Sequence, residues 1–151
     1  MAAMIGNVSV VIDAPLEIVW AIVQDVESAP AWQKGVDATD ALARDDEGRA
    51  TCCETLTDLR FKVFKSRLSF SYAPPDRLSW VQEHGDLKSL HGSWQLEDLG
   101  DGRTRATYAL QADPGALLSR FLKGALEEKL RAVLIDGRAA ELKARAEAAA
   151  A

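Results

Sequence analysis

One stretch of the sequence, Arg77 to Glu97, concentrates the residues best able to do chemistry, because it contains both histidines of the chain and two of its four tryptophans. Histidine exchanges protons near neutral pH, so His84 could serve as a general acid or base. Glu54 could do the same if it were buried without a partner, since burial raises the pKa of a carboxyl group. Alternatively, the stretch forms the wall of a binding cavity and performs no chemistry.

Motifs for other kinds of chemistry are missing from the sequence. It contains no Gly-rich phosphate loop, no nucleophile elbow and no pair of histidines at metal-binding spacing. Cys52 and Cys53 are adjacent, so a disulfide between them would be strained, and two ligands alone do not form a zinc site. We therefore assign no catalytic residue, predict no metal and no cofactor, and expect both cysteines to be reduced structural residues.

Length and charge narrow the class of protein further. A chain of 151 residues, 48% of them hydrophobic and 27% charged, fits a single globular domain over residues 1–151. The net charge is −5 and the lysines and arginines are scattered, which argues against a nucleic acid or an anionic membrane surface as the main partner. No basic region precedes an apolar run and no run of 18 apolar residues occurs, so we expect a cytoplasmic protein without integral membrane association.

The first part of the chain predicts a strand followed by two helices. "NVSVVIDAP" alternates as a strand does, and Pro15 is suited to the first turn of a helix over "PLEIVWAIVQD". The next segment, "VESAPAWQKG", has room for only a short second helix, because Pro30 interrupts it and Gly35 ends it.

Residues 36–112 predict strands separated by turns. Short turn sequences such as "DEG", "APPD" and "GDG" divide this region, which favours an antiparallel meander over a parallel sheet. The six predicted strands are "VDATDALARD", "RATCCETLTD", "LRFKVFKSRLSFSY", "RLSWVQEHG", "DLKSLHGSWQLEDL" and "RTRATYALQA".

The last segment predicts one long helix. Asp113 is a suitable N-cap and Pro114 a suitable first residue. Leucines then recur at helical spacing and form one apolar stripe that must pack on another element. No second stripe accompanies it, so the sequence indicates no particular oligomeric state. The stripe consists of Leu118, Leu122, Leu126, Leu130 and Leu134.

The side-chain alternation of the strands predicts which residues of the Arg77–Glu97 hairpin face the interior. A three-residue loop over 85–87 pairs Trp80 with Gly92 and Leu78 with Trp94, which separates apolar from polar faces better than a two-residue loop. Gly92 then leaves space opposite Trp80, either for that ring or for a guest. The same register pairs Gln82 with Leu90 and His84 with Lys88. The inner face is predicted to carry Leu78, Trp80, Gln82, His84, Leu90, Trp94 and Leu96.

Three polar residues have two interpretations each. For His84 we favour a partly exposed strand tip over a ligand contact. Glu54 shares its parity with Cys52 and Leu56 and could point inward, although a bulge or strand end that returns it to solvent is favoured. Tyr108 is predicted to face inward, where its hydroxyl needs a partner in the protein or on a guest.

The segments "VVIDAPLEIVWAIVQDVESAPAW", "PPDRLSW" and "GDLKSLHGSWQLEDLGDGRTRATYAL", in this order and spacing, resemble the START-like (SRPBCC) superfamily. The resemblance covers nearly the whole chain and is specifically to its polyketide cyclase/dehydrase and lipid-transport branch, which also includes coenzyme Q-binding proteins. It implies the α+β helix-grip fold, in which a seven-stranded curved antiparallel sheet wraps a long C-terminal helix around a cavity. Many members bind an apolar molecule there, and relatively few perform chemistry.

These observations favour binding of a hydrophobic small molecule or lipid between sheet and helix, for transport or sequestration, in a cavity of roughly 300 to 1,000 Å³. The first alternative is a cofactor-independent polyketide cyclase or dehydratase that moves protons through His84 or Glu54. The second is a protein or ribosome interaction module, against which the acidic composition argues. The predicted ligand-binding residues are Trp80, Gln82, His84, Leu90, Trp94, Leu96, Tyr108, Leu118, Leu122 and Leu126.

Overall fold

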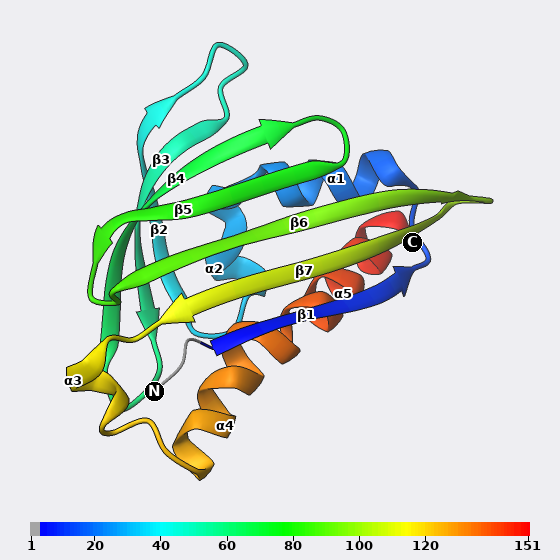
Figure 1. The fold of residues 1–151 in the computed structure, drawn as a ribbon. Coiled ribbons are helices and arrows are strands. Elements are labelled where there is room, and N and C mark those ends of the chain that lie inside the picture. The colour runs from blue at the N-terminus through cyan, green and yellow to red at the C-terminus, as the bar shows by residue number, and fades with distance from the viewer. Residues whose placement is uncertain (1–3) are drawn as a thin grey trace.

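The computed structural model describes residues 4–151 and contains one seven-stranded antiparallel sheet in the order β1-β7-β6-β5-β4-β3-β2 (Figure 1). Six strands follow one another as a meander, as predicted, and β1 adds to the free edge of β7. Residues 1–3 of the predicted 1–151 domain lie outside the described residues. The strands are β1 (Met4–Ile12), β2 (Val36–Arg44), β3 (Ala50–Asp58), β4 (Val63–Ala73), β5 (Arg77–Gly85), β6 (Ser89–Gly100) and β7 (Arg103–Asp113).

Helices cover one face of this curved sheet (Figure 1). Between β1 and β2 the chain forms α1 (Leu16–Gln24), a 3₁₀ turn (Val26–Ser28) and the short α2 (Ala29–Trp32), which confirms the two predicted helices. The C-terminal α5 (Arg138–Ala150) packs on β1 and α1. Within residues 4–151, no helix combines the length and the apolar character required to cross a lipid bilayer.

The C-terminal helix begins later than the sequence predicts. Asp113 is the last residue of β7 and does not cap a helix at Pro114; its Oδ1 accepts a hydrogen bond from the Gly115 N–H at 2.8 Å. Gly115 and Gly124 have φ of 85° and 56°, conformations that interrupt a right-handed helix and are accessible mainly to glycine. The segment therefore divides into α3 (Ala116–Ser119), α4 (Ala125–Arg131), a π-helical turn (Ala132–Asp136) and α5.

The helices approach β1 closely because Gly6 lacks a side chain. A Cβ at Gly6 would lie 3.0 Å from Cγ2 of Ile135, in the π-helical turn, and 3.1 Å from Nη2 of Arg131. Arg131 also donates a hydrogen bond to the carbonyl of Ile5. The long C-terminal helix of the predicted fold is present from Ala125 onward, held against the first strand.

The predicted register of the β5–β6 hairpin is confirmed at its base and wrong at its tip. Leu78 pairs with Trp94 and Trp80 with Gly92, as expected, but the ladder ends at the pair Val81–His91. The predicted pairs of Gln82 with Leu90 and His84 with Lys88 are absent from the pairing between these strands. Beyond Val81 the two strands separate: β5 remains paired with β4 only, and β6 remains paired with β7 only.

A β-bulge in β5 reverses the expected orientation of His84. Leu68 of β4 pairs with Gln82, and the next residue back, Arg67, pairs with His84, so Glu83 is the extra residue. Arg67 lies on the outer face, and His84 beside it is exposed. The prediction that His84 faces inward is wrong, because one inserted residue inverts the alternation of side chains beyond it.

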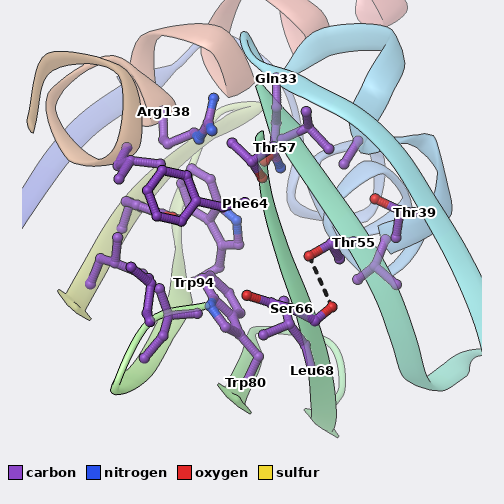
Figure 2. Close-up of a pocket in the computed structure, with 18 of the residues that line it drawn as sticks. Gln33, Thr39, Thr55, Thr57, Phe64, Ser66, Leu68, Trp80, Trp94 and Arg138 are labelled. Carbon is purple, nitrogen blue, oxygen red and sulfur yellow. Dashed lines mark hydrogen bonds between the residues drawn. The ribbon is translucent and has the colours of Figure 1, made fainter. Parts of the chain in front are cut away.

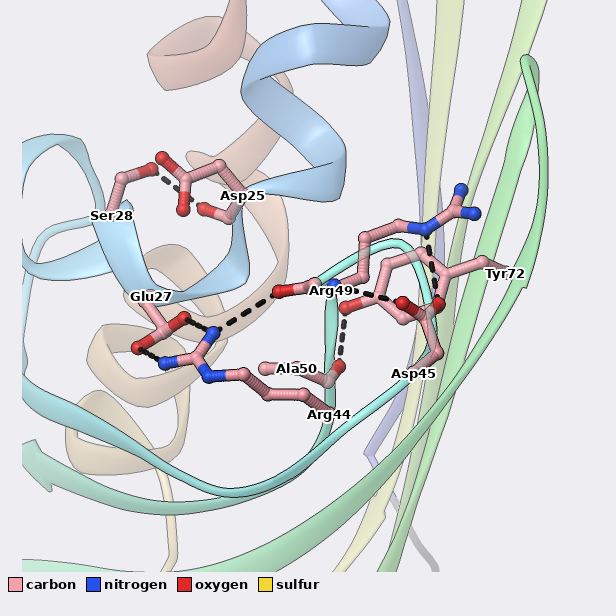
Figure 3. A network of polar contacts seen from close by, with 9 residues as sticks. Asp25, Glu27, Ser28, Arg44, Asp45, Arg49, Ala50 and Tyr72 are labelled. Atoms are coloured by element: carbon pink, nitrogen blue, oxygen red, sulfur yellow. Dashed lines mark hydrogen bonds and ion pairs between the residues drawn. The ribbon is translucent and has the colours of Figure 1, made fainter.

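A polar network fixes the 3₁₀ turn to the sheet (Figure 3). Arg44 on β2 donates to both carboxylate oxygens of Glu27, at 2.6 and 2.9 Å. In the adjoining loop, Arg49 Nε lies 3.1 Å from Asp45 Oδ2, and the Tyr72 hydroxyl donates to the carbonyl of Ala50 at 2.5 Å. The network thereby joins the helical layer to three neighbouring strands.

Candidate ligand-binding cavity

A cavity lies between the inner face of the sheet and the helices, and all seven strands contribute to its lining (Figure 2). The cavity has a volume of about 150 Å³. This volume is below the range of about 300 to 1,000 Å³ expected from the sequence. The six aromatic side chains of the lining account for the difference, since they fill much of the space. They are Trp32, Phe64, Phe70, Trp80, Trp94 and Tyr108.

Five of these rings form a continuous series from α2 to β4. Trp94 is central to it: its ring centroid lies 4.6 Å from that of Tyr108 and 6.5 Å from that of Trp32. Tyr108 is 5.7 Å from Trp80, which in turn is 6.3 Å from Phe70. All four pairs are tilted, an arrangement that aromatic quadrupoles favour over face-to-face stacking. The series presents ring surface to anything held in the cavity.

The position of Trp80 depends on Gly92. A Cβ at Gly92 would lie 2.5 Å from Cζ2 of Trp80 and 2.9 Å from the carbonyl oxygen of Ala109, both far inside van der Waals contact. Of the two uses predicted for the space at Gly92, the structure shows that the Trp80 ring occupies it. The indole therefore contacts the backbone of β6 at Gly92.

Arg138 is a buried cation at the helix side of the cavity, and the protein neutralises it. Its side chain is 3% exposed, and Nη1 donates to the carbonyl of Lys34 at 2.8 Å and to Oε1 of Glu141 at 2.9 Å. Burial raises the pKa of the neighbouring Tyr108 to about 12, a rise that the Arg138 guanidinium limits. The phenol is therefore protonated at neutral pH and can donate a hydrogen bond.

Hydroxyl groups line the opposite wall in a row across three strands. Thr39 of β2 pairs with Thr55 of β3, and Thr55 pairs with Ser66 of β4. Thr55 Oγ1 donates to the Ser66 carbonyl at 3.3 Å (Figure 2), and Ser66 Oγ donates to Gln82 Oε1 at 2.9 Å. Thr39 Oγ1 is buried and has no hydrogen-bond partner within residues 4–151.

Glu54 does not face this cavity. Cys53, Thr55 and Thr57 point inward, with Cys53 fully buried, so Glu54 projects from the outer face. There its carboxylate lies 3.6 Å from the Arg67 guanidinium. The favoured interpretation, that Glu54 points to solvent, is confirmed. The cause is not a local bulge but the alternation of β3, in which Cys53, Thr55 and Thr57 face inward and Glu54 faces outward.

The structure brings half of the predicted ligand-binding residues to the cavity. Gln82 touches it only indirectly, by accepting a hydrogen bond from Ser66. Leu96 is 2% exposed in the solid core, and Leu118 and Leu126 are half-buried against the core without lining the cavity. His84 is exposed on the outer face. The predicted residues that line the cavity are Trp80, Leu90, Trp94, Tyr108 and Leu122.

Sequence reasoning missed the polar lining. Thr39, Thr55 and Ser66 resemble ordinary strand residues, and only the sheet register shows that they are neighbours. Arg138 lies beyond the last leucine of the apolar stripe, where the sequence gives no signal of burial. The one available signal for the hydroxyl row was that Glu54 and Asp58 share the face opposite to Thr55 and Thr57, and Leu56 on that charged face obscures it.

A curved antiparallel sheet that holds an aromatic cavity against a C-terminal helix defines a helix-grip protein of the START-like class. The family model described as polyketide cyclase / dehydrase and lipid transport matches residues 6–147, so the chain belongs to that family. In the described part of the chain, no three His, Cys, Asp or Glu side chains gather in a way that could hold a metal ion.

Solved structures share this fold at low sequence identity. A START superfamily protein from Mycobacterium smegmatis is 20% identical with a TM-score of 0.74, and the match covers 97% of this chain and 96% of that one. The ZhuI aromatase/cyclase from Streptomyces sp. R1128 is 16% identical with a TM-score of 0.76, covering 96% and 94%. A conserved protein from Geobacillus kaustophilus is 14% identical with a TM-score of 0.77, covering 97% of both chains. A comparison with curated proteins gave no significant match.

Proposed function

We propose that this protein binds a hydrophobic small molecule in the cavity between the sheet and the C-terminal helices. The observation that carries the proposal is the series of tilted rings around Trp94, which borders an interior space that the side chains leave open. Ligand cavities in proteins are typically apolar and aromatic with a few placed polar groups. Membership in a family described by polyketide and lipid chemistry supports the same conclusion.

Binding is a better explanation of the cavity than the cyclase or dehydratase alternative. That alternative assigned proton transfer to His84 or Glu54, and both side chains lie on the outer face of the sheet. The titratable groups that do line the cavity are Asp25, Tyr108, whose pKa of about 12 keeps it protonated, and Arg138, which is paired with Glu141. Tyr108 and Arg138 are not bases at neutral pH, so among the described residues an enzyme would have to rely on the single carboxyl group of Asp25.

Native mass spectrometry of the protein purified from its own host tests the proposal. We expect an apolar guest to remain bound under gentle ionisation. Val36→Phe, which adds a ring to the lining, should lose most of that guest. Val81→Phe makes the same change at a site that is 52% exposed, and should retain it. A chain without any guest, or equal retention by the two folded variants, would contradict binding in this cavity.

A further inference from the structure

The unpaired hydroxyl of Thr39 is unusual for its burial. Thr39 is 9% exposed, lines the cavity, and its Oγ1 has no partner within residues 4–151, whereas Thr55 and Ser66 beside it are engaged by the protein. A buried hydroxyl without a hydrogen bond destabilises a folded protein, and most buried polar groups are paired for that reason. Valine has the same shape without this cost, so no hydrogen bond within the described residues explains why a hydroxyl is present here.

Thr39 lines the cavity, and its hydroxyl oxygen is covered by neighbouring groups without bonding to any of them. Figure 2 shows the Thr39 oxygen on the side of the other lining residues, with Thr55 and Ser66 following it across the sheet. A molecule lying against Trp80 and Trp94 would have one edge on the rings and could present the other to this row. A hydroxyl both donates and accepts, so its partner could be a hydroxyl or a carbonyl oxygen.

The charges around the cavity select against an ionised guest. Asp25 and Arg138 are the two charged residues of the described chain that line it. Arg138 is already held by Glu141 and the Lys34 carbonyl, and Asp25 would repel an anion. One neutral hydroxyl does not offset the desolvation of a carboxylate or phosphate.

We propose, on the basis of the binding function above, that Thr39 Oγ1 is a subsite for a neutral oxygen of the ligand. The ligand is then a ring-bearing, uncharged molecule with a hydroxyl or carbonyl group on the edge that faces β2. The Thr39 subsite distinguishes such a molecule from a plain hydrocarbon and from a fatty acid or other acidic lipid.

Three probes with one ring system test this subsite: naphthalene, 2-naphthol and 2-naphthoate, which at pH 7 are apolar, neutral with one hydroxyl, and anionic. Binding is followed by NMR through the indole N–H signals of Trp80 and Trp94. Wild type should bind 2-naphthol about fivefold more tightly than naphthalene, the effect of one neutral hydrogen bond, and 2-naphthoate more weakly than 2-naphthol. Thr39→Val should abolish the preference for 2-naphthol and leave the affinity for naphthalene unchanged.

A matched control and a stability measurement separate recognition from structure. Thr107→Val removes a hydroxyl that bonds to Ser9 Oγ at 2.7 Å on the outer face, and should leave all three affinities unchanged. Without ligand, Thr39→Val should melt at the wild-type temperature or above it. A clear drop would mean that the Thr39 hydroxyl serves the fold, which overturns the subsite.

The remaining outcomes distinguish the subsite from the function on which it rests. If naphthalene binds but Thr39→Val keeps the preference for 2-naphthol, the subsite is wrong and the binding cavity stands. The same holds if 2-naphthoate binds as tightly as 2-naphthol. If none of the probes shifts the two indole signals of the wild type, the cavity does not bind such guests and both proposals fail.

Discussion

The contact between Trp80 and Gly92 shows how a single residue without a side chain shapes the cavity. The Trp80 indole covers the backbone of β6 at Gly92 and continues the aromatic series from Tyr108 to Phe70. Any side chain at this position would push the ring toward the interior. The glycine therefore sets both the volume of the cavity and the orientation of its aromatic wall.

Gly92→Ala is expected to lower the free energy of unfolding by about 1–3 kcal/mol, the usual cost of overpacking a filled interior. The new methyl would overlap the Trp80 ring, which can turn, and the Ala109 carbonyl oxygen at 2.9 Å, which belongs to a strand and yields less. Urea unfolding followed by tryptophan fluorescence measures the loss. Ser93→Ala, one residue along the strand, is the control and should change stability little. An unchanged midpoint for Gly92→Ala would mean that the ring is not held against the strand.

At the scale of single residues, the sequence predicts inward positions only where alternation is uninterrupted. Trp80, Trp94 and Tyr108 lie on the predicted face because the strands around them keep a period of two. His84 does not, because the bulge at Glu83 leaves no mark in the hydrophobic pattern. The phase of β3 was equally ambiguous, since Leu56 and Cys53 are apolar residues of opposite parity.

At the scale of elements, the leucine stripe predicted the C-terminal helix but not where it breaks. Helical periodicity continues through Gly124, although φ at that residue is positive and the helix restarts at Ala125. Leu122 lies in the connection before this break and lines the cavity, whereas Leu118 and Leu126 do not. Periodicity reports which face is apolar, whereas a glycine in a left-handed conformation has no periodic signal.

The beginning of α5 is anchored by one buried ion pair, and we expect the loss of that pair to destabilise the protein. Glu141 accepts from Arg138 Nη1 at 2.9 Å and from the Lys34 N–H at 2.7 Å, which joins α5 to the segment before β2. Glu141→Ala leaves the Arg138 charge buried without its partner, and should lower the free energy of unfolding by about 2–4 kcal/mol. Thermal or urea unfolding of the variant measures the loss.

Two further variants separate the buried charge from a general loss of helix contacts. The double change Arg138→Met with Glu141→Leu should recover part of the lost stability, because no unpaired charge remains. Glu147→Ala removes a glutamate one and a half turns further along α5, where the ion pair with Lys143 is more exposed, and should cost less than Glu141→Ala. If Glu141→Ala and Glu147→Ala lowered the free energy of unfolding equally, burial of the Arg138–Glu141 pair would not increase its contribution to stability.

At the scale of the whole molecule, the fold depends on pattern more than on particular residues. Solved structures with 14–20% identity to this chain share it with TM-scores of 0.74 to 0.77. Such a fold requires only that an apolar inner sheet face and an apolar helix stripe cover each other. The polar groups inside, such as Thr39 and Arg138, are not required by that pattern. For this reason the sequence predicted the fold more fully than the residues that line its cavity.

Two carboxylates join the layers of the molecule and make its stability depend on pH. A hydrogen bond from Arg44 lowers the pKa of Glu27 below its ordinary value of 4.5, and a hydrogen bond from Lys143 does the same for Glu147. Glu27 connects the helical layer to β2, and Glu147 accepts from the Asp13 N–H at the end of β1. A depressed pKa in the folded state means that the unfolded chain binds more protons as the pH falls.

The contribution of these two groups is therefore complete above about pH 5 and is lost as the pH falls through their lowered folded-state pKa values. The double variant Glu27→Gln with Glu147→Gln keeps the side-chain shape and removes both charges. Its melting temperature should lie a few degrees below that of the wild type at about pH 7, and the gap should close as the pH falls through the lowered folded-state pKa values of the two groups, because the wild-type carboxylates then become protonated as well. Melting curves recorded across this range measure the gap directly. If the difference in melting temperature between wild type and variant stayed constant down to acid pH, it would not depend on the carboxylate charge. The loss of stability would then come from packing and not from charge.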